Sequence, residues 1–190
     1  MKKGTLAFVF RLTVTLLLIT AVVAAALAAV NAVTADKIAA MNVEKTRKAV
    51  GLVLPGVEDF EELTREETWD SKVQAVYCGR TADTNAVCYA VEVTPVGFGG
   101  ELTMMVGLDS TGTVLGISIV SHSETVGVGA AAAADNAKGT GFRNQFAGVN
   151  QQVAVTKDGG TIDALSGATV TSRAVTEGVN IALAWFAAHS

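Results

Sequence analysis

The stretch "ELTMMVGLDSTGTVLGISIVSHSE", residues 101–124, places two apolar runs on either side of a short polar segment. Met104–Val106 and Val114–Ile117 consist largely of residues that favour strands. The intervening "DSTG" contains Asp, Ser and Gly, which are common in tight turns. The pattern predicts a β-hairpin.

Comparable segments lie on both sides of this hairpin, at residues 72–79, 86–100 and 151–163, and we expect a strand in each. Residues 125–148 are punctuated by glycine and are expected to form a long irregular loop. The chain closes with a helical pattern at 172–188, whose shared apolar face would hold Val175, Val179, Ala182, Trp185 and Phe186. A strand-rich centre with helical flanks predicts an α+β fold with a mostly antiparallel sheet.

Residues 12–33 carry no charge and are long enough to cross the hydrocarbon core of a membrane, which is about 30 Å thick. We expect a single transmembrane helix here. Lys2, Lys3 and Arg11 precede it, so the positive-inside bias predicts a cytoplasmic N-terminus and an extracytoplasmic remainder. The alternative is a cleavable signal peptide, because Val33-Thr34-Ala35 resembles a small-residue cleavage site.

The expected organisation has three parts. Residues 1–35 form the cytoplasmic N-terminus and anchor, residues 36–72 a helical stalk and domain entry, and residues 73–190 the extracytoplasmic domain. The acidic run within 57–70 is interpreted as a solvated face.

The charge balance excludes one class of partner. Beyond residue 35, 11 basic residues stand against 18 acidic ones, a formal net charge of −7. Such a domain would repel nucleic-acid phosphates, and no polybasic face indicates peripheral membrane binding. Cys78 and Cys88 could close a disulfide-bonded hairpin or remain separate buried thiols, and they lack the second pair that a metal site requires.

Enzyme motifs are missing from the sequence. His122 is the one credible catalytic base, and nothing else marks a catalytic triad. The glycines at 97–100 lack the following helix of a dinucleotide fingerprint, and no P-loop is present. We therefore predict neither a catalytic residue nor a metal ligand.

The segment "DALSGATVTSRAV", residues 163–175, gathers hydroxyl side chains around Gly167, just before the final helix. Thr171 or Ser172 is expected to cap that helix. The start of a helix also favours a phosphate group, and a glycine allows its close approach. The residues alone leave helix capping and phosphate binding open.

Residues 163–169, "DALSGAT", resemble the D-x-x-[ST]-G-A-T motif of proteins whose final threonine carries FMN through a phosphoester bond. Residues 107–129 also resemble the hairpin and the "H-x-E-T-x-G-x-G" signature of that FMN-binding domain. With its anchor, the chain is similar over nearly its whole length to the G subunits of Rnf electron-transport complexes.

The resemblance implies covalent FMN on Thr169, attached by a flavin transferase that recognises an element including Asp163 and uses FAD as the FMN donor. Ser166, Gly167 and Ala168 would shape the phosphate-side turn, together with Thr171. Leu165 and Val170 would contact the flavin ring, and Glu124 and Thr125 would lie close to it. The family usually has proline after the Glu-Thr pair, so Val126 predicts a less rigid loop.

The implied function is electron relay in a membrane complex that couples electron flow between ferredoxin and NAD to ion movement. Its partners would be the other membrane and cluster-bearing Rnf subunits. Two alternatives stay open: the C subunit of a sodium-translocating NADH:quinone reductase, which shares the motif, and a cofactor-free membrane-anchored binding domain.

Overall fold

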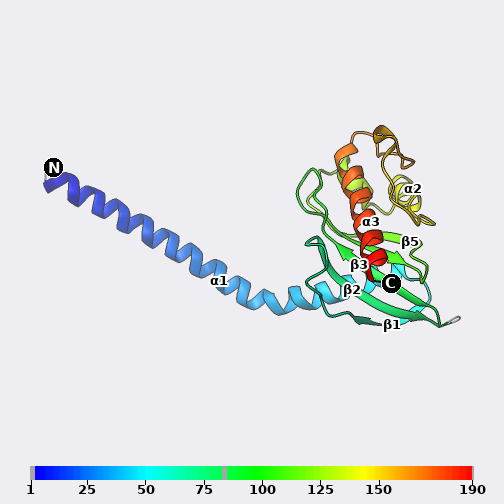
Figure 1. Cartoon of the computed structure of the whole chain (residues 1–190). Helices are drawn as coiled ribbons and strands as arrows, with labels where there is room; N and C mark the ends of the chain where they lie inside the picture. Colours follow the sequence, from blue (N-terminus) through cyan, green and yellow to red (C-terminus); the bar gives the residue numbers. More distant parts are fainter. Residues whose placement is uncertain (1–2, 83–84, 190) are drawn as a thin grey trace. The chain divides into compact units, whose positions relative to one another are not determined.

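A computed structural model describes residues 3–82 and 85–189 of the chain (Figure 1). Its contacts divide the chain into two compact units, Met1–Glu44 and Lys45–Ser190. Helix α1 (Lys3–Val53) begins in the first unit and ends in the second. The organisation expected from the sequence, with boundaries at residues 35 and 72, stays a prediction.

Within the described residues, one helical segment, Phe8–Ala35, is long and apolar enough to cross a membrane. Its 28 residues extend about 42 Å at 1.5 Å per residue, more than the core of a bilayer requires. Its threonine side chains are satisfied within the helix: Thr13, Thr15, Thr20 and Thr34 each donate to the carbonyl four residues earlier. The segment therefore presents no unpaired threonine hydroxyl to lipid.

The second unit is built on a five-stranded sheet in which every neighbouring pair is antiparallel and the spatial order follows the chain. The strands are β1 (Val57–Glu62), β2 (Val73–Thr81), β3 (Val87–Val93), β4 (Thr103–Leu108) and β5 (Val114–Ser121). The predicted hairpin is β4–β5, and the Asp109 carboxylate accepts hydrogen bonds from the backbone of Thr111 and Thr113 in its turn. The predicted α+β class is confirmed.

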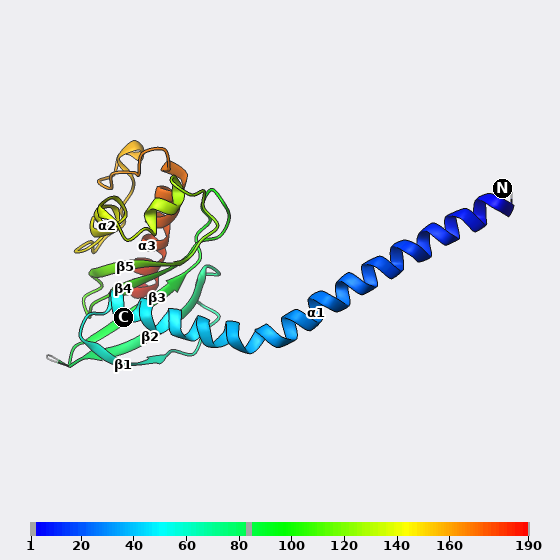
Figure 2. The ribbon, with the colours of Figure 1, turned by 180° about the vertical axis from the view of Figure 1, so that it is seen from behind.

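Both faces of the sheet are buried. Helix α3 (Thr169–His189) covers one face (Figure 1). Four residues of its predicted apolar face are buried there and Phe186 is half-buried; the four are Val175, Val179, Ala182 and Trp185. The last turns of α1 cover the other face, seen from behind in Figure 2. Consecutive residues of β4 supply the two cores, Met104 to the first and Met105 to the second, which explains why this strand is apolar throughout.

Two glycines set how closely the helices approach. A Cβ added at Gly107 of β4 would collide with the backbone of Val53 at the end of α1. A Cβ at Gly178 of α3 would lie 2.5 Å from Sδ of Met104, on the opposite face. Each helix therefore packs directly on the sheet at a glycine: at Gly107 the obstacle to a side chain is backbone, and at Gly178 it is the side chains of Met104, Pro95 and Val93.

Strand β1 was not anticipated. It lies within the acidic run assigned to the stalk and domain entry, and it pairs with β2 at the edge of the sheet. Asp59, Glu61 and Glu62 on it are exposed, as expected for a solvated face. Charged side chains on an edge strand also hinder pairing with other chains.

The prediction of a strand at residues 151–163 is wrong. This stretch holds an isolated bridge between Val155 and Ile162 and the short 3-10 helix η2 (Thr156–Asp158). The reason lies in α3, whose Asn180 side chain donates to the carbonyl of Val153 and accepts from its N–H. These bonds occupy backbone groups that a neighbouring strand would use.

The expected loop at 125–148 contains two short helices, η1 (Gly129–Ala132) and α2 (Ala137–Asn144). The Asn136 side chain caps α2 by accepting a hydrogen bond from the N–H of Gly139. An N-cap of this kind begins a helix even where apolar periodicity is weak.

The register decides the state of the two cysteines. Between β2 and β3, Cys88 lies opposite Gly79, and Cys78 lies opposite Tyr89, so the two cysteines are offset by one residue in the pairing. Because successive residues of a strand point to opposite faces, the two thiols lie on opposite sides of the sheet, and both are free. Burial raises the pKa of both thiols. The disulfide alternative is therefore excluded.

We expect Gly107→Ala and Gly178→Ala each to lower the free energy of unfolding by about 1–3 kcal/mol, because the added methyl group overpacks a helix–sheet contact. Gly116→Ala is the matched control: it pairs with Gly107 across the β4–β5 ladder, and nothing lies within 4 Å of its added Cβ. Denaturant titration of the full chain in detergent, followed by tryptophan fluorescence, measures the difference. Equal stability of all three variants would contradict direct packing at these glycines.

Candidate functional site

A cavity of about 450 Å³ lies where the loops after β3 and β5 meet η2 and the beginning of α3. It collects residues from segments far apart in the sequence. They are Phe98, Glu124, Thr125, Val128, Gly129, Lys157, Gly167, Ala168, Thr169, Val170 and Thr171.

Glu124 is the central polar group of this cavity, and only 8% of its surface is exposed. Its Oε1 accepts a hydrogen bond from the backbone N–H of Gly99 at 3.1 Å. Its Oε2 accepts one from the hydroxyl of Thr171 at 2.7 Å. The carboxylate thus joins the loop after β3 to the first turn of α3, although Glu124 itself follows β5.

Glycines surround this carboxylate because no side chain would fit. A Cβ at Gly97 would collide with Oε1 of Glu124, and a Cβ at Gly129 would collide with Oε2. A Cβ at Gly99 would collide with the carbonyl oxygen of Ser123. Gly97 and Gly99 of the "GFGG" segment therefore leave room for Glu124, a structural role that the sequence did not reveal.

The turn before α3 is held by a side chain from within the helix. The Ser172 hydroxyl accepts from the N–H of Leu165 and donates to the carbonyl of Ala168, both at 2.9 Å. Gly167, which lies between Leu165 and Ala168 in the chain, has φ +78°, a left-handed conformation that favours glycine. Thr169 is the first residue of α3.

This arrangement corrects the prediction that Thr171 or Ser172 caps the final helix. The helix begins earlier than expected, and both side chains lie within it. Thr171 is bonded to Glu124, and Ser172 is bonded to the preceding turn. Thr169, the first residue of the helix, lines the cavity.

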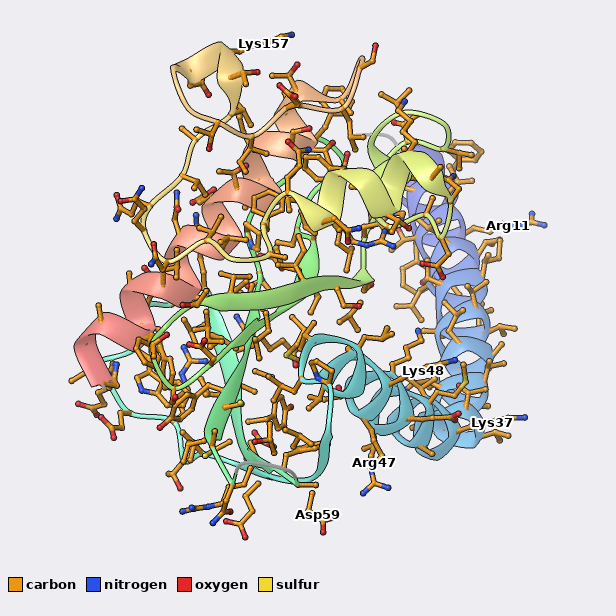
Figure 3. The ribbon with its side chains drawn as sticks, turned by 90° about the vertical axis from the view of Figure 1, so that its right-hand side faces the viewer. Arg11, Lys37, Arg47, Lys48, Asp59 and Lys157 are labelled. Carbon is orange, nitrogen blue, oxygen red and sulfur yellow. The ribbon has the colours of Figure 1, made fainter. Side chains whose placement is uncertain are left out.

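Thr169 has a cationic neighbour. The Lys157 ammonium on η2 donates a hydrogen bond to Oγ1 of Thr169 at 3.0 Å. The next residue, Asp158, forms two hydrogen bonds with Arg173, which lies one turn beyond Thr169 on α3. Lys157 is labelled on η2 in Figure 3.

The cavity brings together all the predicted cofactor-binding residues except Leu165 and Ser166. The Leu165 side chain is buried in the core beneath α3, and Ser166 is exposed. The sequence missed Phe98, Val128, Gly129 and Lys157 as lining residues. Signals existed for two of them: Gly129 is the last glycine of the "H-x-E-T-x-G-x-G" signature, and Phe98 stands among three glycines. Lys157 gave no signal, because a lysine in a polar turn is typical of a solvated residue.

The family model described as FMN-binding domain matches residues 97–184, the segment that contains this whole cavity. The G subunit of the ion-translocating oxidoreductase complex of Methanosarcina acetivorans is 33% identical over 180 residues, which cover 93% of both chains. The G subunit of the Na(+)-translocating ferredoxin:NAD(+) oxidoreductase complex of Acetobacterium woodii is 35% identical over 194 residues, covering 92% of this chain and 90% of that one.

The chain belongs to the family of Rnf complex G subunits. Among solved structures, it is similar to the C subunit of the Na(+)-translocating NADH-quinone reductase from Parabacteroides distasonis. The TM-score is 0.52 at 20% identity, covering 70% of this chain and 79% of the other. At that identity the likeness shows a shared fold, and it adds no functional assignment to the Rnf G-family membership.

We expect Thr171→Val to lower the free energy of unfolding of this Rnf G-family chain by about 1–3 kcal/mol, because it leaves Oε2 of buried Glu124 without its donor. Thr176→Val is the matched control. Thr176 is also buried in α3, and its hydroxyl bonds to the backbone carbonyl of Ser172 within the same helix. Denaturant titration of both variants measures the difference, and equal losses would show that the Glu124 bond contributes nothing of its own.

Proposed function

We propose that this chain is a membrane-anchored flavoprotein subunit of an ion-translocating ferredoxin:NAD oxidoreductase complex, and that it relays electrons through FMN attached to Thr169 by a phosphoester bond. One observation carries the proposal. The Thr169 hydroxyl stands at the beginning of α3 on the wall of a cavity that lies wholly within the segment matched by the FMN-binding domain.

The residues of the cavity suit this cofactor. Its volume of about 450 Å³ lies within the usual range of small-molecule sites, about 300–1,000 Å³. Phe98, Val128 and Val170 provide apolar contacts for an aromatic ring system. At the other side, the start of α3 favours a phosphate on Thr169. Leu165, predicted as a ring contact, would support the turn from the core instead.

When bound, FMN supplies a centre that accepts and releases electrons one or two at a time. The chain's own residues hold this centre in place. Glu124 and the glycines around it fix the loops that form the cavity walls, and the covalent bond to Thr169 would keep the cofactor from dissociating. A fixed cofactor suits an electron relay between subunits, where the distance between redox centres must stay constant.

We propose two kinds of partner. The other membrane and cluster-bearing subunits of an Rnf complex would exchange electrons with this subunit, in line with the names of its relatives. A flavin transferase would attach the FMN during maturation. Asp163 is accessible to such an enzyme, because its side chain is exposed. The backbone N–H and C=O of Asp163 are hydrogen-bonded to the Gln145 side chain, which fixes the position of the segment.

Co-expression of the chain with a flavin transferase is expected to give a fluorescent band after denaturing electrophoresis, and Thr169→Val is expected to abolish it. Thr161→Val is the matched control, because it makes the same change at an exposed residue outside the 163–169 motif and should leave the label intact. Ser166→Ala tests the other hydroxyl of the motif. Mass spectrometry of the labelled peptide identifies the bond.

Three outcomes would change the proposal. A dark wild-type band beside an active transferase would favour the cofactor-free binding domain. A label that survives Thr169→Val but is lost in Ser166→Ala would move the attachment site to Ser166. A label that survives both changes would place it on a different residue.

We also propose that the N-terminus is cytoplasmic and the flavin domain extracytoplasmic. Lys2, Lys3 and Arg11 before the span support this orientation. Lys37, Lys45, Arg47 and Lys48 follow the span and oppose it, so the orientation calls for a direct measurement.

Alkaline phosphatase fused to the C-terminus is expected to be active, because this enzyme folds only outside the cytoplasm. Green fluorescent protein fused at the same place is expected to be dark. The reverse pair of results would place the domain in the cytoplasm.

A further inference from the structure

The segment 155–160 is fixed to the beginning of α3 by side chains of two adjacent residues. Lys157 contacts Oγ1 of Thr169. Asp158 accepts two hydrogen bonds from Arg173, from Nε to Oδ2 at 2.7 Å and from Nη2 to Oδ1 at 2.6 Å. Thr169 and Arg173 lie one helical turn apart, so both contacts fall on the same side of α3.

The base of this segment is also constrained. Val155 and Ile162 form a bridge, and a Cβ at Gly160 would collide with the carbonyl oxygen of Ala154. Gly159, with φ +83°, ends η2 immediately after Asp158. With its base packed and its tip paired to Arg173, the segment has little freedom to carry Lys157 away from Thr169.

The charges at the cavity make Lys157 distinctive. Among the described residues that line the cavity, Lys157 is the one cation and Glu124 the one carboxylate. A phosphodiester on Thr169 brings a further negative charge. Without Lys157, the cavity lining would place the carboxylate of Glu124 near that phosphate charge and would offer no cation to balance it.

We propose that Lys157 binds the phosphate of the FMN on Thr169, and that the Asp158–Arg173 ion pair is a clamp that positions Lys157 for this contact. This inference rests on the proposed attachment of FMN to Thr169. Its physical basis is distance: an ammonium 3.0 Å from Oγ1 lies within reach of the non-bridging oxygens of a phosphate bonded to that atom.

The same contact acts during attachment. Oγ1 of Thr169 attacks the FMN-side phosphorus of FAD, the Oγ1–P bond forms, the pyrophosphate P–O bond breaks, and AMP leaves. The hydroxyl proton passes to a general base of the transferase, because the ammonium of Lys157 has no free lone pair. Lys157 attracts the incoming pyrophosphate and then pairs with the charge that remains on the diester.

At neutral pH Asp158 carries the negative charge that this ion pair requires. Hydrogen bonds from Arg173, together with the positive charges of Arg173 and Lys157, lower the pKa of Asp158. A lowered carboxyl pKa means that the pair persists above the ordinary range of aspartate and is lost only as the pH falls below it.

Lys157→Gln is expected to slow FMN attachment to the full chain on the order of tenfold, measured as fluorescence per protein over time with a transferase and FAD. Lys157→Arg is expected to recover most of the rate, because it restores the charge. Lys48→Gln is the matched control. It makes the same change on an exposed lysine of α1, which lies well away from Lys157 in Figure 3, and it should label at the wild-type rate.

The ionic strength separates a charge effect from a structural one. Raising the salt from about 0.05 to 0.5 M should slow the wild type more than Lys157→Gln, because the variant lacks one of the charge contacts that screening weakens. The melting temperature of Lys157→Gln should match that of the wild type, since the side chain is exposed.

The positioning role of the Asp158–Arg173 pair is tested by Arg173→Gln, which keeps Lys157 and should therefore slow attachment less than Lys157→Gln does, with a smaller loss of salt dependence. The exchange Asp158→Arg with Arg173→Asp should recover part of the rate. A Lys157→Gln chain that labels at the wild-type rate and with the same salt dependence would overturn the role of Lys157. A wild type that does not label would instead overturn the attachment itself, so the two failures are distinguishable.

Discussion

The close approach of α3 to the sheet is the constraint on which the rest of the domain depends. Gly178 lets α3 lie directly against Met104 and Pro95, and the apolar face that begins at Val175 is buried as a consequence. Because a helix is rigid, this contact also sets where its first residue lies. Thr169 is thereby held at the cavity by packing that occurs two turns away.

On the other face of the sheet, a glycine again allows a helix to approach closely. Gly107 admits the end of α1, and the buried cluster around Val50 and Val53 joins that helix to β2, β3 and β4. The helix that contains the membrane span is thus continuous with an element of the domain core.

Glu124 connects the loops at the site to this frame. It is buried, it accepts from Gly99 and Thr171, and glycines occupy the places where side chains would displace it. Such a carboxylate is costly to bury and is retained only where its oxygens are bonded. Here it joins the loop after β3, the segment after β5 and the first turn of α3.

The sequence by itself determined the membrane span, the β4–β5 hairpin, the apolar face of the last helix and the segment that contains Thr169. Each of these depends on residues close together in the chain, so periodicity and local motifs are sufficient to indicate them. Only the tertiary structure decided the remainder. Asn180 prevents a strand at residue 153, the register separates Cys78 from Cys88, and η2 carries Lys157 to Thr169. These outcomes depend on contacts between residues far apart in the chain, which no local pattern records.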